Sequence, residues 1–442
     1  MRRSSSSHYA SAIILLLLLV ALPPNVFAGG PIAVGSPGFG IDGQPFTWNT
    51  TVPIQYHTDG GPLSKKPDGT VVIDNAAALV RVASMFQVWQ DVPTATIAYS
   101  AAGPITGVAD SDVDSVAEYN AVAGSCEVAA QNPIVFDADG SLFRDLGKDP
   151  SVIGFAGPCL SPTGRIVSGI AVLNGIFQDG EPDTDENPEI SAEIFDAAFI
   201  HEFGHFSGLD HAQINVRCLR TCSTAELEGV PTMFPIAIDP EMKSLAPDDI
   251  EWISRLYPAP GFVASQGTIS GTILFSDGVS QTQGVNVIAR LVNDPATPQD
   301  ESRSAAFSVV SGFEFTESPG QDITGTNPGG SPFGSRNPGL IGHFQLLLPP
   351  GNYTLEVESI NAAFEGGSGV GPLPSPVPIP GGVPEFWNDT ESAKDSPQAK
   401  TPIVVSAGGT VGNINIILNG TPARFDKFES SEFASSVGAQ GR

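Results

Sequence analysis

The chain has 442 residues, with 48 aspartates and glutamates against 20 lysines and arginines, and a formal net charge of −28 at pH 7. This acidity argues against the basic surface that nucleic-acid-binding proteins need, so we expect no nucleic-acid partner. Charged residues make up 15% of the sequence and hydrophobic residues 41%, a balance that favours folded domains over disorder. The length, with 49 glycines and 39 prolines, predicts two domains joined by loop-rich segments.

The first residues have the pattern of a secretory signal. Two arginines precede an apolar run at residues 12–22, and small residues follow up to Ala28. A membrane anchor is the alternative, but the run is short and ends at two prolines. We therefore expect a signal peptide at residues 1–28 and a flexible lead-in at residues 29–45. The protein is expected to be secreted and extracellular, with no membrane span.

The following part of the chain alternates between strand and helix patterns. Residues 52–57 alternate as a strand, and strands are also expected at residues 96–99 and 132–137. Between the first two, apolar residues recur at helical spacing after a capping aspartate, which predicts a buried helix face with these members: Asp74, Leu79, Val82, Phe86 and Trp89. A further helix start is expected at residues 187–189, where a proline and an acidic residue follow an asparagine.

The stretch HEFGHFSGLDH begins at His201 and carries the strongest chemical signal. His201 and His205 are four residues apart, so a helix places both imidazoles on one side. Gly208 can adopt the left-handed conformation that ends a helix, which lets the chain turn and bring His211 back. Three neutral imidazoles leave one tetrahedral zinc position open to water, which is the catalytic arrangement. Glu202 lies beside them and can take the proton of that water as it attacks a carbonyl carbon.

This stretch resembles the zinc signature of the metzincin endopeptidases. Residues 231–235 resemble their Met-turn, which implies that Met233 lies beneath the zinc ligands, and residues 245–257 resemble the last helix of the matrixin branch. The resemblance implies an α+β catalytic domain at residues 46–258, with a twisted mixed sheet plus helices that carry the motif. It also implies that residues 166–174 form the edge strand above the cleft, where a peptide or protein substrate binds in an extended conformation.

The four cysteines are expected to form disulfides, because the chain is expected to be exported. Three pairings are open. Cys218 and Cys222 are close enough to close a small loop, which leaves Cys126 with Cys159, and we prefer this pairing. The lead-in contains no cysteine, so the thiol-to-zinc latency of animal matrixins is absent.

Two acidic stretches contain candidate calcium ligands. Carboxylates that alternate around a glycine turn can hold calcium, although the stretch from Asp137 lacks the last glutamate of an EF-hand. A solvated polar turn is the alternative. The candidates are Asp137, Asp139, Asp179, Glu181, Asp183 and Asp185, which makes Ca²⁺ a candidate cofactor beside Zn²⁺.

The composition changes after residue 258. Residues 259–266 are expected to be a linker, and the following chain has alternating β patterns at residues 268–273, 284–289, 342–357 and 404–418. This part resembles the transthyretin-like, carboxypeptidase-regulatory-type β-sandwich, at residues 267–420, with a polar tail at residues 421–442. The boundary predicts that residues 29–260 fold alone and cleave small peptides.

The leading hypothesis is a secreted zinc endopeptidase whose β-sandwich serves adhesion, substrate capture or stability. The competing hypothesis is a non-catalytic extracellular or matrix-binding protein with a vestigial or structural zinc site. A third hypothesis is an enzyme that mainly removes its own tail. The intact Glu202 favours the first hypothesis, because a purely structural site does not need a general base.

Overall fold

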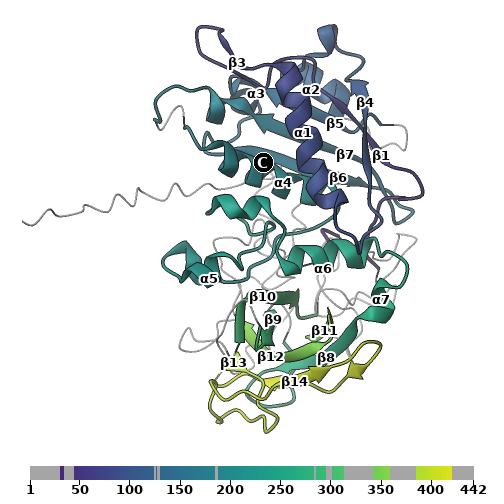
Figure 1. Cartoon of the computed structure of the whole chain (residues 1–442), viewed down its shortest axis with the longest axis vertical. Helices are drawn as coiled ribbons and strands as arrows, with labels where there is room; N and C mark the ends of the chain where they lie inside the picture. Colours follow the sequence, from purple (N-terminus) through teal and green to yellow (C-terminus); the bar gives the residue numbers. More distant parts are fainter. Residues whose placement is uncertain are drawn as a thin grey trace, which may run out of the picture.

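The computed structural model describes residues 30–33, 44–123, 126, 130–184, 188–282, 285–294, 301–312, 342–358 and 385–420. Helices combine with several sheets, which confirms the predicted α+β class. Figure 1 shows two parts, with the first half of the chain above and the strands from β8 onward below. The expected signal peptide and polar tail, and most of the lead-in, lie outside the described residues.

The upper part is built on a five-stranded sheet with the order β4-β1-β5-β7-β6. The first four of these strands run parallel, and β6 pairs antiparallel with β7, so the sheet is mixed. A small hairpin joins β2 to β3. The strands are β1 (Ile54–Thr58), β2 (Ser64–Lys65), β3 (Val71–Ile73), β4 (Tyr99–Pro104), β5 (Pro133–Asp137), β6 (Gly154–Leu160) and β7 (Ile166–Asn174).

The edge strand differs from the expectation. Residues 166–174 form β7, which lies between β5 and β6, so the prediction that they form the edge is wrong. The edge strand beside β7 is β6, whose two glycines and Pro158 obscure any alternating pattern in the sequence. A proline lacks the N–H that a strand with two neighbours needs, and this favours an edge position.

Seven α-helices are present among the described residues. Asp74 caps the first, as predicted, since its carboxylate accepts a hydrogen bond of 2.8 Å from the Ala77 N–H. The predicted start at residues 187–189 is wrong, because the Ile190 N–H bonds to the Phe177 carbonyl and the helix begins only after its Ser191 cap. The helices are α1 (Asn75–Gln90), α2 (Val116–Ala123), α3 (Ser141–Asp145), α4 (Ala192–Phe206), α5 (Thr224–Leu227), α6 (Pro247–Leu256) and α7 (Phe262–Ser265).

Helices α1 and α4 pack against each other through aromatic side chains. The rings of Phe86 and Phe203 stack with centroids 3.9 Å apart. Trp89 is fully buried, and its indole N–H donates a hydrogen bond of 2.8 Å to the Ile200 carbonyl. Leu79, predicted to belong to the same stripe, is 39% exposed at the border of the packed face. Apolar spacing on α1 therefore holds α4 in a defined position on the sheet.

The lower part consists of two sheets that share one apolar core. One has the order β10-β9-β12-β13 with β14 also paired to β12, and the other has the order β11-β8-β15 with β16 also paired to β8. The strands β10 and β13 were not predicted from the sequence. The strands are β8 (Gly267–Leu274), β9 (Asn286–Val292), β10 (Glu301–Val310), β11 (His343–Leu348), β12 (Gly351–Glu358), β13 (Glu385–Phe386), β14 (Ile403–Val405), β15 (Thr410–Val411) and β16 (Ile416–Ile417).

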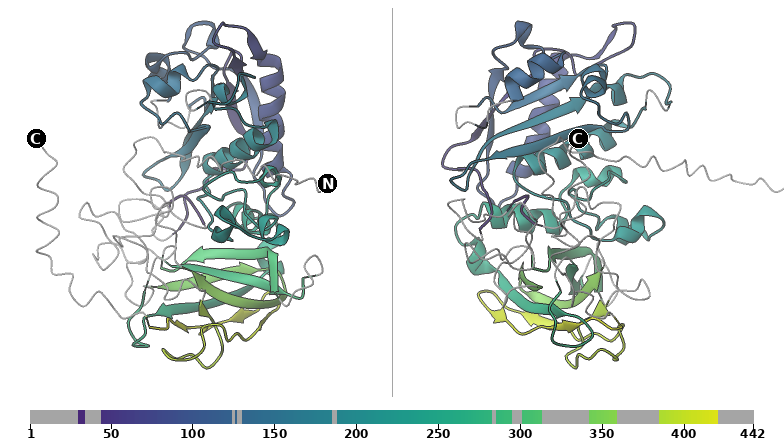
Figure 2. Two further views of the ribbon diagram at one scale, coloured as in Figure 1. Left: turned by 90° about the vertical axis from the view of Figure 1, so that its left-hand side faces the viewer. Right: turned by 180° about the vertical axis from the view of Figure 1, so that it is seen from behind.

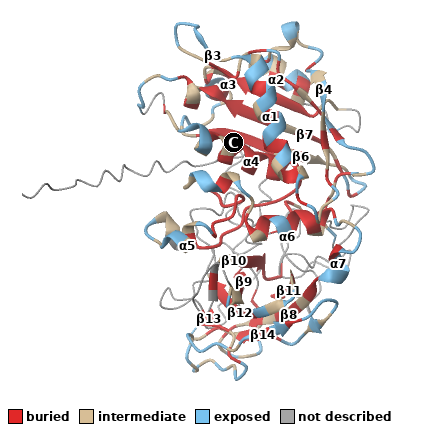
Figure 3. Cartoon of the chain, viewed as in Figure 1, coloured by how far each residue is buried: buried red, intermediate tan, exposed pale blue. Residues whose placement is uncertain are grey.

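Helix α6 lies where the two parts meet, and both views in Figure 2 agree on this position. The Trp252 indole N–H donates a hydrogen bond of 2.9 Å to the Ser308 carbonyl on β10. Figure 3 shows that burial continues from the upper sheet through this junction into the lower strands. In the part of the chain that the structure describes, no helix has the length and apolar character needed to cross a membrane.

Candidate metal centre

The metal centre is built on the C-terminal half of α4. Its apolar residues Phe195, Phe199 and Phe203 are fully buried and hold the helix against the sheet. His201 and His205 are four residues apart on this helix, as the sequence predicted, and both side chains are buried. The packing of α4 thus places two imidazoles inside the protein at a fixed spacing.

The chain reverses direction directly after α4. Gly208 has a φ of +97°, which is the left-handed region that glycine adopts most readily. The Leu209 N–H donates a hydrogen bond of 2.9 Å to the Gly204 carbonyl, which closes the end of the helix. Residues 30–33 pair with this turn, since the Ile32 N–H bonds to the Gly208 carbonyl at 2.8 Å. The turn returns His211 to the side of the two helical histidines.

The three histidines converge in one buried group. The Nε2 atoms of His205 and His211 are 3.1 Å apart, and the ring of His201 lies 4.6 Å and 5.1 Å from their rings, measured between centroids. One nitrogen from each ring lies within 4.8 Å of the others. The three residues are therefore positioned to bind a metal ion.

Hydrogen bonds to carbonyls decide which ring nitrogens are available. The Nδ1 atom of His201 lies 2.8 Å from the Thr232 carbonyl, and that of His205 lies 2.9 Å from the Leu209 carbonyl. A carbonyl only accepts, so both Nδ1 atoms carry hydrogen and both Nε2 atoms keep a lone pair when the rings are neutral. Burial lowers the pKa of His205 to about 4 and that of His201 well below its usual value, so both rings are neutral. The buried Nε2 atom of His201 has no hydrogen-bond partner, as expected of an atom that binds a metal ion.

Glu202 is buried beside the first histidine. Its carboxylate accepts a hydrogen bond from the Ala156 N–H on β6, while its Oε1 atom has no hydrogen-bond partner. Burial raises the pKa of Glu202 to about 8 in the metal-free protein, and the Ala156 N–H offsets part of this effect. Glu202 therefore offers a buried carboxyl oxygen beside the three histidines.

Met233 packs closely against the histidine helix at Gly204. A side chain at Gly204 would collide with the Met233 sulfur, so the glycine within the helix allows the close approach. The turn that carries Met233 is held from α6, because Asp249 accepts hydrogen bonds of 2.8 Å and 3.0 Å from the N–H groups of Thr232 and Met233. Since the Thr232 carbonyl also orients His201, Asp249 supports the metal centre indirectly.

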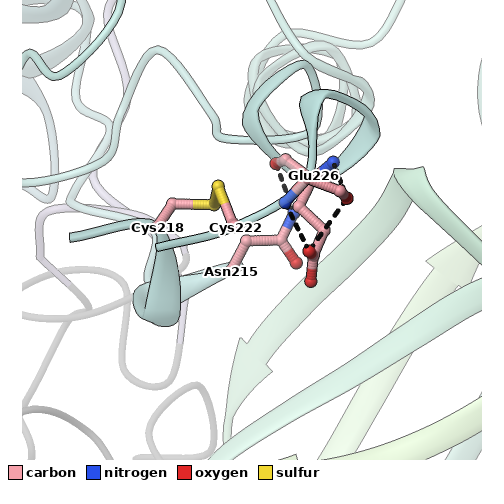
Figure 4. The surroundings of a disulfide bond; sticks show 5 residues. Asn215, Cys218, Cys222 and Glu226 are labelled. Carbon is pink, nitrogen blue, oxygen red and sulfur yellow. Dashed lines mark hydrogen bonds between the residues drawn. A yellow bond between two sulfur atoms is a disulfide. The ribbon is translucent and has the colours of Figure 1, made fainter. Parts of the chain in front are cut away.

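A disulfide-closed loop separates His211 from Met233, and Figure 4 shows its surroundings. Cys218 pairs with Cys222, and Cys126 pairs with Cys159, which is the pairing that the spacing favoured. Asn215 has a positive φ of 58° and donates a hydrogen bond of 2.8 Å to the carbonyl of Glu226 in α5. The loop is therefore tied back to the segment that follows the third histidine.

A small cavity lies beside His201, between α4 and the chain after the Met-turn. Its walls are mainly apolar, and two of them are the small side chains of successive alanines on α4. Apart from His201, the lining residues are Ile153, Ala197, Ala198, Thr232, Ala237 and Met242. The cavity has room for about one water molecule next to His201.

The candidate calcium ligands have other partners within the described residues. Asp137 is buried and accepts a hydrogen bond of 2.7 Å from the Phe143 N–H, and burial raises its pKa to about 6. Asp139 pairs with Lys65 at 3.1 Å and Glu181 with Lys66 at 2.9 Å.

The second acidic stretch also bonds to its own backbone. The Asp179 carboxylate accepts a hydrogen bond of 2.7 Å from the Glu181 N–H, and Asp183 accepts one of 3.4 Å from the Glu189 N–H. Asp185 lies outside the described residues. Among the residues that the structure describes, the histidine triad is the one group of three side chains close enough to hold a metal ion.

Two contributors to the site escaped the sequence analysis. Asp249 lies three residues after Ala246 and two after Pro247, a pattern typical of a helix start, which explains its position but not its bond to the Met-turn. Ala156 contributes only its backbone N–H, and a pattern of side chains in the sequence cannot predict that contact. No protein-family model matches this chain, and a search of curated proteins finds no match.

Proposed function

We propose that the protein is a secreted zinc-dependent endopeptidase of the matrixin-like branch of the metzincins. The observation that carries this proposal is the convergence of three buried imidazoles next to Glu202, which is itself buried and has an unpartnered Oε1. A site that only held a metal would not need such a carboxylate. Three histidine ligands also suit zinc and leave a coordination position for a reactant.

Features outside the site support the same proposal. A mixed sheet with a motif-bearing helix and a methionine turn fits the resemblance to metzincins. The two lower sheets with a shared core fit the resemblance to a transthyretin-like β-sandwich. The signal pattern before residue 29 supports secretion, and the two disulfides suit an oxidising compartment.

We infer that a peptide substrate binds extended along the edge strand β6. One side of β6 pairs with β7, and Ala156 of β6 donates its N–H to Glu202. A peptide added at this edge therefore passes the carboxylate.

His201, His205 and His211 would hold the zinc ion through their Nε2 atoms. When bound, zinc supplies a Lewis acid that polarises a water molecule and the substrate carbonyl. Glu202 accepts the proton of the water as its oxygen attacks, and then returns it to the leaving amine. Thr232 and Leu209 keep the first two rings in the correct tautomer through their carbonyls.

The test is Glu202→Gln in the full-length secreted protein. We expect peptide hydrolysis to fall by at least ~10²–10⁴, because a general base is lost, while bound zinc stays near one per chain. Hydrolysis of casein and of a peptide library would be measured together with zinc content. Glu228→Gln, at an exposed position, is the matched control and should keep full activity.

The outcomes separate the three hypotheses. Activity of Glu202→Gln within a few-fold of wild type would contradict the mechanism. Stoichiometric zinc in an inactive wild-type protein would favour the matrix-binding alternative. Cleavage of the chain itself without cleavage of casein would favour self-processing. His205→Ala should lose zinc as well as activity, because two imidazoles hold the ion poorly.

A further inference from the structure

The segment directly after His211 contacts both parts of the molecule. On one side, the Ala212 N–H donates a hydrogen bond of 2.7 Å to the Met233 carbonyl. On the other, the Asn286 side chain of β9 donates one of 2.9 Å to the Gln213 carbonyl. The third ligand is therefore followed, two residues later, by a bond to the C-terminal sheet.

Packing continues this contact. Ile214 is fully buried, and it packs in a small apolar cluster with Ile288 of β9 and Ala306 of β10. These two strands are neighbours in one sheet. Because β9 alternates between its two faces, Ile288 points toward the metal-bearing part while Val287 and Ala289 belong to the core shared with the second sheet. The outer face of the C-terminal sheet thus supports the return segment of the histidine turn.

A second connection runs through α6. Asp249 on this helix fixes the Met-turn, as described above, and its neighbour Asp248 accepts a hydrogen bond of 2.6 Å from the Ser308 N–H on β10. The Trp252 indole donates to the carbonyl of the same serine. Asp248, Trp252 and Ser308 are all buried. The Met-turn and, through Thr232, His201 are therefore connected to the same strand that contacts Ile214.

We propose that the C-terminal β region positions the metal centre, with Asn286, Ile288 and Ser308 as positioning residues that act through Gln213, Ile214 and α6. The inference rests on the proposed zinc site, but it concerns the geometry of the ligands and not the hydrolytic step. Removing a residue that orients a metal ligand typically changes metal affinity by ~10–100-fold. The C-terminal region then completes the centre and is not a separate accessory module.

The experiment compares single variants of the full-length chain. Asn286→Ala removes the hydrogen bond to Gln213, and Ile288→Ala removes the packing on Ile214. Zinc affinity is measured by competition with a chelator, below the unfolding temperature of each variant, and the visible absorption of the Co²⁺-loaded protein reports ligand geometry. We expect the zinc Kd to rise about tenfold in each variant and the Co²⁺ spectrum to change.

Ile273→Ala is the matched control. Ile273 is as deeply buried as Ile288, but it lies on β8 in the core between the two lower sheets. It should lower the unfolding temperature without changing the zinc Kd by more than about twofold. If Ile288→Ala fails to fold, Asn286→Ala still tests the proposal, because it deletes one side-chain hydrogen bond only.

Two results would overturn the proposal. One is an unchanged zinc Kd and Co²⁺ spectrum in folded Asn286→Ala and Ile288→Ala. The other is an equal loss of zinc affinity in Ile273→Ala, which would mean that general stability sets the affinity. Neither result depends on peptide hydrolysis, so a failure of the proposed function, measured with Glu202→Gln, remains distinguishable.

Discussion

The two parts of the molecule differ in what their buried polar groups do. In the upper part, Asp59 and Asp137 accept hydrogen bonds from backbone N–H groups, and the two helical histidines donate to carbonyls of their own region. In the lower part, Arg290 on β9 and Glu356 on β12 form a buried ion pair. The histidines and Glu202 lie in the upper part, but the segment that follows His211 packs against the lower part as well.

The junction is unusually acidic on the side of the upper part. Asp248 and Glu251 of α6 are buried there, and burial raises the pKa of both carboxyl groups. Asp249 adds to the effect on Asp248. Helix α6 belongs to the first part in sequence but is covered by the second, so the two parts are not independent units.

The largest effect is expected from removing the lower part. The composition boundary predicted that residues 29–260 fold and cleave peptides alone, but that fragment exposes Ile214 and Trp252 and loses the partner of Asp248. We now expect a lower unfolding temperature and a zinc affinity reduced by about ten- to a hundredfold. Thermal unfolding and chelator competition would measure both. A fragment with wild-type zinc affinity and full peptidase activity would show that the two parts are independent.

A smaller effect is expected from pH. Glu251 has an unpartnered Oε1, and burial raises its pKa to about 8, with Arg255 opposing the shift. A carboxyl whose pKa is raised in the folded state stabilises the fold fully below its ordinary value of about 4.5, and this contribution is lost as pH rises through about 8. Asp248 contributes with the same sign, and Tyr353 faces Glu251 from β12.

Glu251→Gln should therefore flatten the loss of stability between pH 5 and pH 9 and raise the free energy of unfolding at pH 9, by on the order of a few kcal/mol. Unfolding temperatures across this range would measure the effect. Glu241→Gln, at an exposed position, should leave the pH dependence unchanged. If the unfolding temperature of Glu251→Gln depends on pH as steeply as that of the wild type, the Glu251 carboxyl titrates as it does in water.

The smallest effect is expected from calcium, which would act in the upper part alone. Asp139 and Glu181 already pair with lysines, so any added cation competes with existing partners. At a few millimolar calcium and a millimolar Kd, binding to the folded state adds about 1 kcal/mol, or ~2–4 °C in the unfolding midpoint. The midpoint would be compared with calcium and with a calcium chelator, at constant zinc occupancy. No change would identify these loops as solvated turns.

The local parts of the site could be predicted from residue patterns alone. The i to i+4 spacing of the histidines, the glycine that reverses the chain, the short cysteine loop and the Asp74 cap all depend on neighbours within a few residues. Backbone geometry over such distances follows from residue type, so these features could be predicted. The strand patterns around β1, β5, β8 and β12 were also predicted, because their alternation or apolar runs are strong.

The groups that complete the site come together through folding. The order of β6 and β7 in the sheet, the bond from Ala156 to Glu202 and the bonds from Asp249 to the Met-turn join segments that are distant in sequence. The same is true of Asn286 and Gln213. Backbone N–H and carbonyl groups are present at nearly every residue, so their partners leave no mark in the sequence. Burial and strand order select those partners, and both are properties of the assembled chain.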